Sequence, residues 1–294
     1  MKIMFYLVSG FLLMLSANSF KHNSFRKSLL HMSVNTFKSS AHTEFIKKHA
    51  AIDAPKRLET LLALLEFKGE KLIQPDDRKG LNPFLIPVAK IGESKLCYIR
   101  WPTQKVDMDL QLVKTTETGI RLVSMNTNNY IRRVIAEMDF YSMPGSEKAI
   151  ELVNKEGQIY ERGEFLPLLR SGKFPAITDE DLALILDRFL LTKVGPFPDC
   201  YERLAEGFLK KGDVVSALIT CERAVSVFYG WGHPLSYYSN MLKRVPGREI
   251  EARDTARTSL GMPIWTVADT EKELYDLAIS AGFTGTSILG KYII

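Results

Sequence analysis

Histidine and cysteine, which suit nucleophilic and metal chemistry, are scarce in this sequence. Five histidines and three cysteines occur among its 294 residues. Three of the histidines, including His42, lie within the first 43 residues, which leaves His49 and His233 for the rest of the chain. Neither a Cys-x-x-Cys motif nor a histidine pair at metal-ligand spacing occurs, so we expect no metal site and no cofactor.

His233 is the one catalytic candidate. It lies in the segment Tyr229-Gly230-Trp231-Gly232-His233-Pro234, where glycines and aromatic rings could line a pocket. Histidine titrates near neutral pH and can act as a general acid or base. A single histidine in such a turn is more often a hydrogen-bonded packing residue. An enzyme with a pocket around Trp231 and His233 is therefore the alternative hypothesis, and a non-enzymatic role is favoured.

A phosphate-binding loop is nearly matched by residues 285–292, Gly-Thr-Ser-Ile-Leu-Gly-Lys-Tyr. The two glycines and Lys291 fit, but Tyr292 stands where such a loop has the Ser or Thr that holds magnesium. We expect no nucleotide site there.

The aromatic residues near His233 favour a protein-binding surface. Tyr and Trp combine a large apolar ring with a polar group and are common anchors in protein interfaces. The charged segment after Arg248 could extend this surface, although its alternating charges also suit a solvated helix face. The predicted protein-binding residues are Tyr229, Trp231, Tyr237, Tyr238, Arg253 and Arg257.

A helix-pair pattern precedes this surface. It consists of Tyr201, Leu204, Ala205 and Phe208, then Gly212-Asp213, then Ala217, Cys221 and Ala224. The last three would line one helix face with small side chains, so that two helices can cross closely, and Gly212 supplies a tight turn. The pattern, over about residues 199–232, resembles one tetratricopeptide repeat, which implies protein binding. Only one copy is clear, and a generic helical hairpin is the other interpretation.

The net charge does not indicate a nucleic-acid partner. The formal charge is +5, from 39 basic and 34 acidic residues. Residues 1–43 contain Lys2, Lys21, Arg26, Lys27 and Lys38 and no acidic residue, so the rest of the chain is formally neutral. A basic footprint for DNA or RNA is missing.

The N-terminus predicts a targeting segment in two parts. An apolar run from Ile3 to Leu15 is typical of a signal peptide, here residues 1–19, and too short to span a membrane. Residues 20–43 are basic and hydroxylated, as in a transit peptide. The junction Ser16-Ala17-Asn18-Ser19-Phe20 resembles the two-part presequence with which algae that have secondary plastids import plastid proteins.

That resemblance implies a plastid protein. The scattered cysteines Cys97, Cys200 and Cys221 do not form a disulfide framework and suit a reducing compartment such as the stroma. A plain secretory signal before a basic arm is the alternative and would place the protein in the secretory pathway. No integral membrane span is expected after the signal, whereas peripheral membrane contact stays open.

The remaining chain predicts an α+β unit over residues 50–165. Asp53 and Pro55 suggest the start of a helix with a leucine stripe, and Asn128 or Asn129 can cap a second helix. Two hairpins are expected between these helices. They are formed by Phe84–Ala89 with Leu96–Trp101 and by Leu110–Val113 with Ile120–Met125.

Residues 176–294 predict a helical domain. Thr178 and Asp181 approximate a capping box, and Gly195-Pro196 ends the helix that it starts. Further helices are expected at Asp199–Lys211, Val214–Tyr229, Pro234–Arg244, Arg248–Ser259 and Thr270–Ser280. The fold class is thus α+β with a tetratricopeptide-like C-terminal half. The expected function is that of a plastid-imported, non-enzymatic factor that binds another protein, such as an assembly or chaperone-like auxiliary of a plastid complex.

Overall fold

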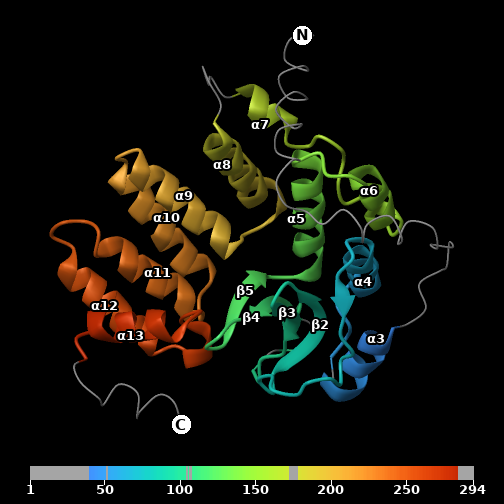
Figure 1. The fold of residues 1–294 in the computed structure, drawn as a ribbon, viewed down its shortest axis with the longest axis horizontal. Coiled ribbons are helices and arrows are strands. Elements are labelled where there is room, and N and C mark those ends of the chain that lie inside the picture. The colour runs from blue at the N-terminus through green and yellow to red at the C-terminus, as the bar shows by residue number, and fades with distance from the viewer. Residues whose placement is uncertain (1–39, 51, 104, 106–107, 172–177, 284–294) are drawn as a thin grey trace.

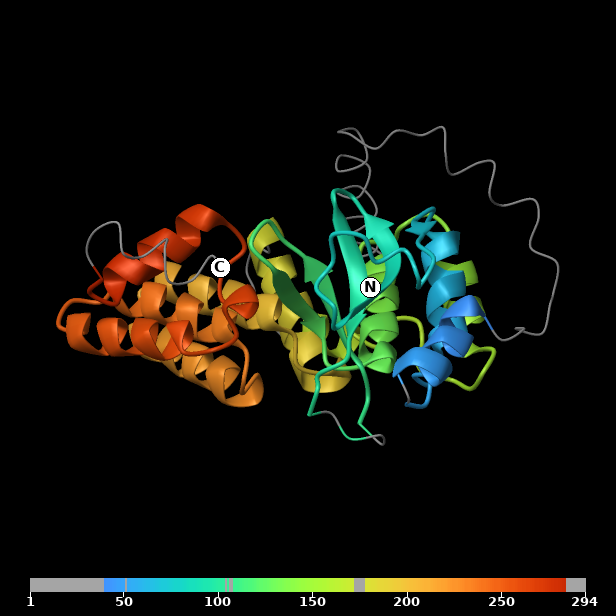
Figure 2. The ribbon, with the colours of Figure 1, turned by 90° about the horizontal axis from the view of Figure 1, so that it is seen from below.

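The computed structural model describes residues 40–283, apart from residues 51, 104, 106–107 and 172–177. An α+β part with one antiparallel sheet is followed by a helical part, and the two lie side by side (Figures 1 and 2). The predicted α+β fold with a mainly helical C-terminal half is therefore confirmed. The predicted signal peptide and the transit segment up to residue 39 lie outside the described residues.

The sheet is a meander whose strands neighbour one another in chain order. Both predicted hairpins are present, because β2 pairs with β3 and β4 pairs with β5. Pro87 lies at a register shift in β2, which suits a residue without an N–H to donate to the ladder. The strands are β1 (Lys71–Leu72), β2 (Leu85–Ile91), β3 (Ser94–Ile99), β4 (Gln111–Thr115) and β5 (Ile120–Ser124).

The fold begins earlier in the chain than the expected residue 50. Helix α3 (Ala41–Phe45) is capped by Ser40, and a π-helical turn (Ile46–Ala50) follows it. His42, which we expected in the transit segment, is buried, and its Nε2 lies 3.1 Å from the carbonyl oxygen of Pro87. Burial is the main cause that lowers the pKa of His42. Residues 40–43 thus pack as part of the α+β unit.

Helix α4 (Leu58–Phe67) begins after Arg57, whereas the sequence predicts its start at Asp53. Arg57 adopts a left-handed backbone conformation with φ 62°. Its guanidinium donates hydrogen bonds of 3.0 to 3.1 Å to three carbonyl oxygens at the end of α6 (Ser146–Asn154), which ties the start of α4 to that helix. The long-range contact therefore sets where α4 begins.

Helix α5 (Thr127–Phe140) covers one face of the sheet. Its cap is Asn126, whose side chain accepts a hydrogen bond from the backbone N–H of Asn129 at 2.8 Å, so the helix starts before the predicted caps. Ile131 and Ile135 are fully buried in a core shared with α4 and with side chains of β2 to β4. The short helix α7 (Leu166–Ser171) leads on toward the helical part.

The helical part begins at α8 (Asp179–Phe189). Thr178 and Asp181 form the predicted capping box, and the π-helical turn Leu190–Val194 ends before Gly195 as expected. The later helices begin and end within two residues of the predicted bounds. They are α9 (Pro198–Lys210), α10 (Val214–Val227), α11 (Gly232–Leu242), α12 (Glu249–Leu260) and α13 (Glu271–Ser280), with a 3-10 turn (Ile264–Thr266) before α13.

Both faces of the sheet are buried, and this joins the two parts of the chain. Side chains alternate along a strand. Leu96 and Tyr98 of β3 therefore pack in the core with α4 and α5, whereas Cys97 and Ile99 belong to a second core on the other face. That second core includes three aromatic residues of the helical part, Tyr201, Phe228 and Trp231. The two expected domains thus share a core.

The turn between β4 and β5 also meets the helical part. The backbone N–H of Glu117 donates a hydrogen bond of 3.1 Å to the carbonyl oxygen of Asp269. A Cβ atom on Gly119 would lie 2.6 Å from the Cα of Trp265, so only glycine allows the two backbones this approach. The hairpin tip is therefore fitted against the segment before α13.

Candidate protein-binding site

The predicted interface residues differ in how far they reach the surface. Trp231 is buried in the core between the sheet and the helical part, where its ring meets Trp101 edge to face with centroids 5.6 Å apart. It is therefore a packing residue. Tyr229, two residues earlier, is 90% exposed.

Tyr237 and Tyr238 on α11 are half-buried and hold neighbouring helices together through their hydroxyls. Tyr237 donates to the backbone carbonyl of Glu202 on α9 at 2.9 Å. Tyr238 donates to the carboxylate of Glu222 on α10 at 2.8 Å. Burial raises the pKa of both phenols, so they stay neutral donors at physiological pH. These contacts give both tyrosines a structural role within the helical part.

Arg253 and Arg257 lie together on α12 beside the end of α13. Arg257 Nε donates to the carbonyl oxygen of Ala281 at 2.8 Å, just after α13 ends. Arg253 Nε lies 3.6 Å from Asp254 Oδ1, and about half of each arginine side chain is exposed. The guanidinium group of Arg257 thus satisfies a backbone carbonyl at the C-terminal end of α13, and the guanidinium groups of both arginines still face solvent.

His233, the catalytic candidate, has a carboxylate next to it. Its Nε2 lies 3.2 Å from Oε1 of Glu202, outside hydrogen-bond geometry. A cavity of about 10 Å³ lies beside Glu202, lined also by Tyr201, Cys221 and Tyr237. That is room for about one water molecule and not for a substrate. The geometry therefore assigns the pair a structural role.

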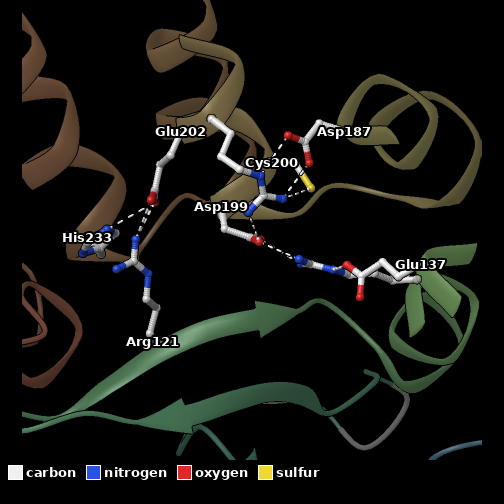
Figure 3. Close-up of polar contacts among 9 residues, drawn as sticks. Arg121, Glu137, Asp187, Asp199, Cys200, Glu202 and His233 are labelled. Carbon is white, nitrogen blue, oxygen red and sulfur yellow. Dashed lines mark hydrogen bonds and ion pairs between the residues drawn. The ribbon is translucent and has the colours of Figure 1, made fainter. Parts of the chain in front are cut away.

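Glu202 belongs to an acidic row on α9 that sequence reasoning missed. The row consists of Asp199, Glu202 and Glu206, which share one helix face by their spacing. Each residue pairs with an arginine of a different element: Arg133 on α5, Arg121 on β5 and Arg244 after α11, respectively. Figure 3 shows dashed contacts from Glu202 to both His233 and Arg121, and from Asp199 to a guanidinium group that lies between it and Glu137. The partners are 66, 81 and 38 residues away, so no local pattern indicates them.

The strongest pairing of the row is that of Asp199. Arg133 donates to both of its oxygens, at 2.7 and 2.5 Å, and Arg203 adds a bond of 2.9 Å. Burial raises the pKa of Asp199, but the hydrogen bonds and charges of the two arginines lower it more. The pKa of Glu202 is also lowered, because contacts with His233 and Arg121 outweigh burial. Both carboxylates are charged at neutral pH and act as structural ion pairs between the two parts.

Exposed apolar side chains gather on the helical part. Of the large apolar residues exposed in the described chain, most lie in or after α10, α12 and α13. They are Val215, Ile219, Val227, Tyr229, Ile250, Tyr275, Ile279 and Phe283. Exposed apolar surface of this kind can serve as a protein-binding site.

Among the described residues there is no group of three His, Cys, Asp or Glu side chains that could hold a metal ion. None of the described helices combines the length and the apolar character that crossing a bilayer requires.

Both folded parts match models of one protein family. The model for the PAB N-terminal region matches residues 40–169, and the model for the PAB middle domain matches residues 198–284. The first match starts at Ser40, the cap of α3. No solved structure matches the chain significantly.

A plant protein is similar over most of the chain. The Arabidopsis thaliana protein named Protein IN CHLOROPLAST ATPASE BIOGENESIS, chloroplastic, is 35% identical over 243 residues, which cover 82% of this chain and 69% of the relative. This identity spans the α+β part and the helical part together. The chain therefore belongs to the PAB family and contains its N-terminal and middle domains.

Proposed function

We propose that this protein acts in the plastid, where it supports the biogenesis of the plastid ATPase by binding another protein. The observation that carries the proposal is the 35% identity to the Arabidopsis protein, because it extends across both folded parts. In this proposal the protein binds another polypeptide before the final complex forms.

The geometry of the helical part supports a protein-binding role. The exposed apolar side chains on α10, α12 and α13 form surface whose removal from water on binding a partner would be favourable. Of the two polar residues that could serve catalysis, His233 and Glu202, Glu202 lines a cavity of only about 10 Å³. Space for one water molecule suits a packed junction between helices.

We place the protein in the stroma, where it would assist assembly as a chaperone-like auxiliary. Its three cysteines are free and buried, which is compatible with a reducing compartment. The predicted two-part presequence also supports import into the plastid. We retain the resemblance of residues 199–232 to a tetratricopeptide repeat as part of the proposal, since helix pairs of that kind bind proteins.

The role in assembly is tested by disrupting the gene in the organism that carries it. We expect the amount of assembled plastid ATPase, resolved on native gels, to fall several-fold, and wild-type protein to restore it. An unrelated photosynthetic complex of the same membranes serves as the control. An unchanged amount of assembled ATPase in the disrupted strain would contradict the proposed function.

Plastid import is tested with fluorescent fusions of residues 1–39. We expect the wild-type segment to direct the fusion into the plastid and Phe20→Ala to stop it. Phe25→Ala changes a second phenylalanine of the same segment and should leave import intact. Secretion of all three fusions would contradict the two-part presequence.

A further inference from the structure

The first residues of the described chain are held by contacts with helix α4. Ser40 caps α3, and its hydroxyl accepts a hydrogen bond of 3.3 Å from the backbone N–H of Thr43. The backbone N–H of Ser40 and the hydroxyl of Thr43 both donate to Oε1 of Glu59 on α4, at 2.8 and 2.7 Å. Ser40 and Glu59 are 19 residues apart, so residues 40–43 are tied to α4 by tertiary contacts.

His42 fixes the same residues to the sheet. Its side chain is buried, and Nε2 lies 3.1 Å from the carbonyl oxygen of Pro87 on β2. A neutral imidazole can donate a hydrogen bond from Nε2 to this oxygen. Ile46, one turn later, is fully buried in the core that α4 and the sheet share. His42 is therefore part of the folded unit.

Composition alone assigns these residues to the transit segment. Ser, Thr and His are polar, and no acidic residue occurs before Glu44. The structure nevertheless gives Ser40, His42 and Thr43 each a polar partner within the fold. The match to the PAB N-terminal model also begins at residue 40. Both observations place the start of the folded unit at Ser40.

A cut within residues 40–43 would remove these contacts. Loss of Ser40 leaves the first turn of α3 without its cap, and caps of this kind stabilise helices. Loss of His42 opens a space beside β2 in the buried part of the fold, which also lowers stability. Loss of Thr43 as well leaves Glu59 without either of its donors. A mature protein that begins at Glu44 would therefore be less stable than one that keeps residues 40–43.

Ser40 is the last residue before which the chain can be cut without these losses. Hydrolysis of the bond between Ser39 and Ser40 consumes one water molecule. It leaves a carboxylate on the removed peptide and an ammonium group on Ser40. The nitrogen of Ser40 lies 2.8 Å from Glu59 Oε1, so its contact would remain as an ion pair. A cut one residue later removes the cap of α3 itself.

We propose that an endopeptidase of the plastid cuts the chain on the N-terminal side of Ser40, so that the mature protein keeps residues 40–43. This inference rests on the proposed function, in which the presequence directs import into the plastid. The protease hydrolyses one peptide bond between Phe20 and Ser40. The transit segment thus ends at or before residue 39, four residues earlier than its composition predicts.

The first test maps the N-terminus of the protein as the organism makes it. The protein is immunoprecipitated from isolated plastids and, separately, from the secretory membranes of the same cells. Its free amino groups are dimethylated before digestion, and mass spectrometry identifies the N-terminal peptide. We expect the protein in the plastid fraction, with a peptide that begins between residues 21 and 40.

The second test asks whether the contacts with α4 hold residues 40–43. It uses recombinant protein that begins at the residue found in plastids, treated with an aminopeptidase. Glu59→Ala removes the acceptor of Ser40 and Thr43, whereas Glu66→Ala removes an exposed carboxylate of the same helix. We expect the peptidase to pass residue 43 about ten-fold faster in Glu59→Ala than in the wild type, because the segment opens more often. Glu66→Ala should keep the wild-type rate.

A third variant leaves α4 unchanged. Thr43→Val removes one of the two donors to Glu59 and should speed the same trimming about three-fold. Circular dichroism melting checks that all three variants are folded. If Glu59→Ala does not fold, Thr43→Val and Glu66→Ala still compare a lost contact with an unrelated change.

Several results would overturn the inference. One is a mature protein that begins at residue 41 or later. Another is a start at Phe20, because only the signal peptide is then removed. Wild-type trimming rates in Glu59→Ala and Thr43→Val would show that the contacts with α4 do not hold the segment. In each case the cell fraction that contains the protein shows separately whether the proposed location in the plastid stands.

Discussion

Both carboxylate oxygens of Glu202 on α9 accept hydrogen bonds from Nη2 of Arg121 on β5, at 2.7 and 2.6 Å. The same guanidinium also pairs with Asp269 before α13. Arg121 thus links the last strand of the sheet to two segments of the helical part. Since less than a fifth of either side chain in the Arg121–Glu202 pair is exposed, solvent screens this pair little.

We expect a double-mutant cycle of Arg121→Met and Glu202→Gln to show a coupling free energy of about 1.5 kcal/mol in urea unfolding. The exposed pair of Arg248, the N-cap of α12, and Glu251 is the control, and its coupling should be below about 0.5 kcal/mol. Equal coupling in the two pairs would show that Arg121 and Glu202 do not join the sheet to α9.

The pairing of Asp199 with Arg133 predicts a loss of stability in acid. Its folded pKa lies below the unfolded value of about 3.9, so its contribution is complete above that value and disappears as the pH falls toward the folded pKa. Between pH 6 and pH 3, the urea midpoint should fall more in the wild type than in Asp199→Asn, by the equivalent of about 1 kcal/mol. Asp276→Asn, which changes an exposed carboxylate of α13, should keep the wild-type pH dependence. A wild-type dependence in Asp199→Asn would contradict the role of this ion pair.

Gly119→Ala should separate steric conflict from backbone strain. The added Cβ would meet the backbone of Trp265, so we expect a loss of roughly 3 kcal/mol in the free energy of unfolding. Gly69→Ala is the comparison, because Gly69 has φ 79° and open space around it and should cost about 1 kcal/mol. Differential scanning calorimetry compares both with the wild type. Equal costs would mean that the hairpin tip does not press against the segment before α13.

The buried cysteines should react slowly. Burial raises the pKa of Cys97 and Cys221 to about 12 and also raises that of Cys200, so almost no thiolate is present at pH 8. We expect Ellman's reagent to label no native cysteine within minutes and all three in guanidinium chloride. Ser226→Cys, on the exposed side of α10, should add one thiol that reacts at once. Fast labelling of the wild type would show that one cysteine reaches solvent.

Helix bounds were largely predictable because their signals are local. The capping box of Thr178 and Asp181, and the small residues after Gly212, each act within a few turns of chain. The likeness of the pair α11–α12 to the pair α9–α10 escaped the sequence analysis. The small residues Ala252, Ala256 and Ser259 of α12 repeat the spacing, but the matching large residues of α11 differ from those of α9 in kind and in offset.

The sites were less predictable than the fold. Trp231 and Tyr229 share one turn and one residue class, yet the first is buried and the second is almost fully exposed. The two residues differ because Trp231 packs against the second face of the sheet, whereas Tyr229 does not. Tyr275 and Ile279 of α13 are also exposed although neither belongs to the predicted surface, because a helix stripe does not show which of its faces a neighbouring helix covers.

The sequence alone determined the α+β class, the two hairpins and the succession of C-terminal helices, because periodicity and capping are encoded by residues close in the chain. Tertiary structure alone decided that the sheet is buried on both faces, that Glu202 meets Arg121 across 81 residues, and that Ile279 of α13 is exposed. Those relationships depend on which distant surfaces meet, and no spacing within one element records that.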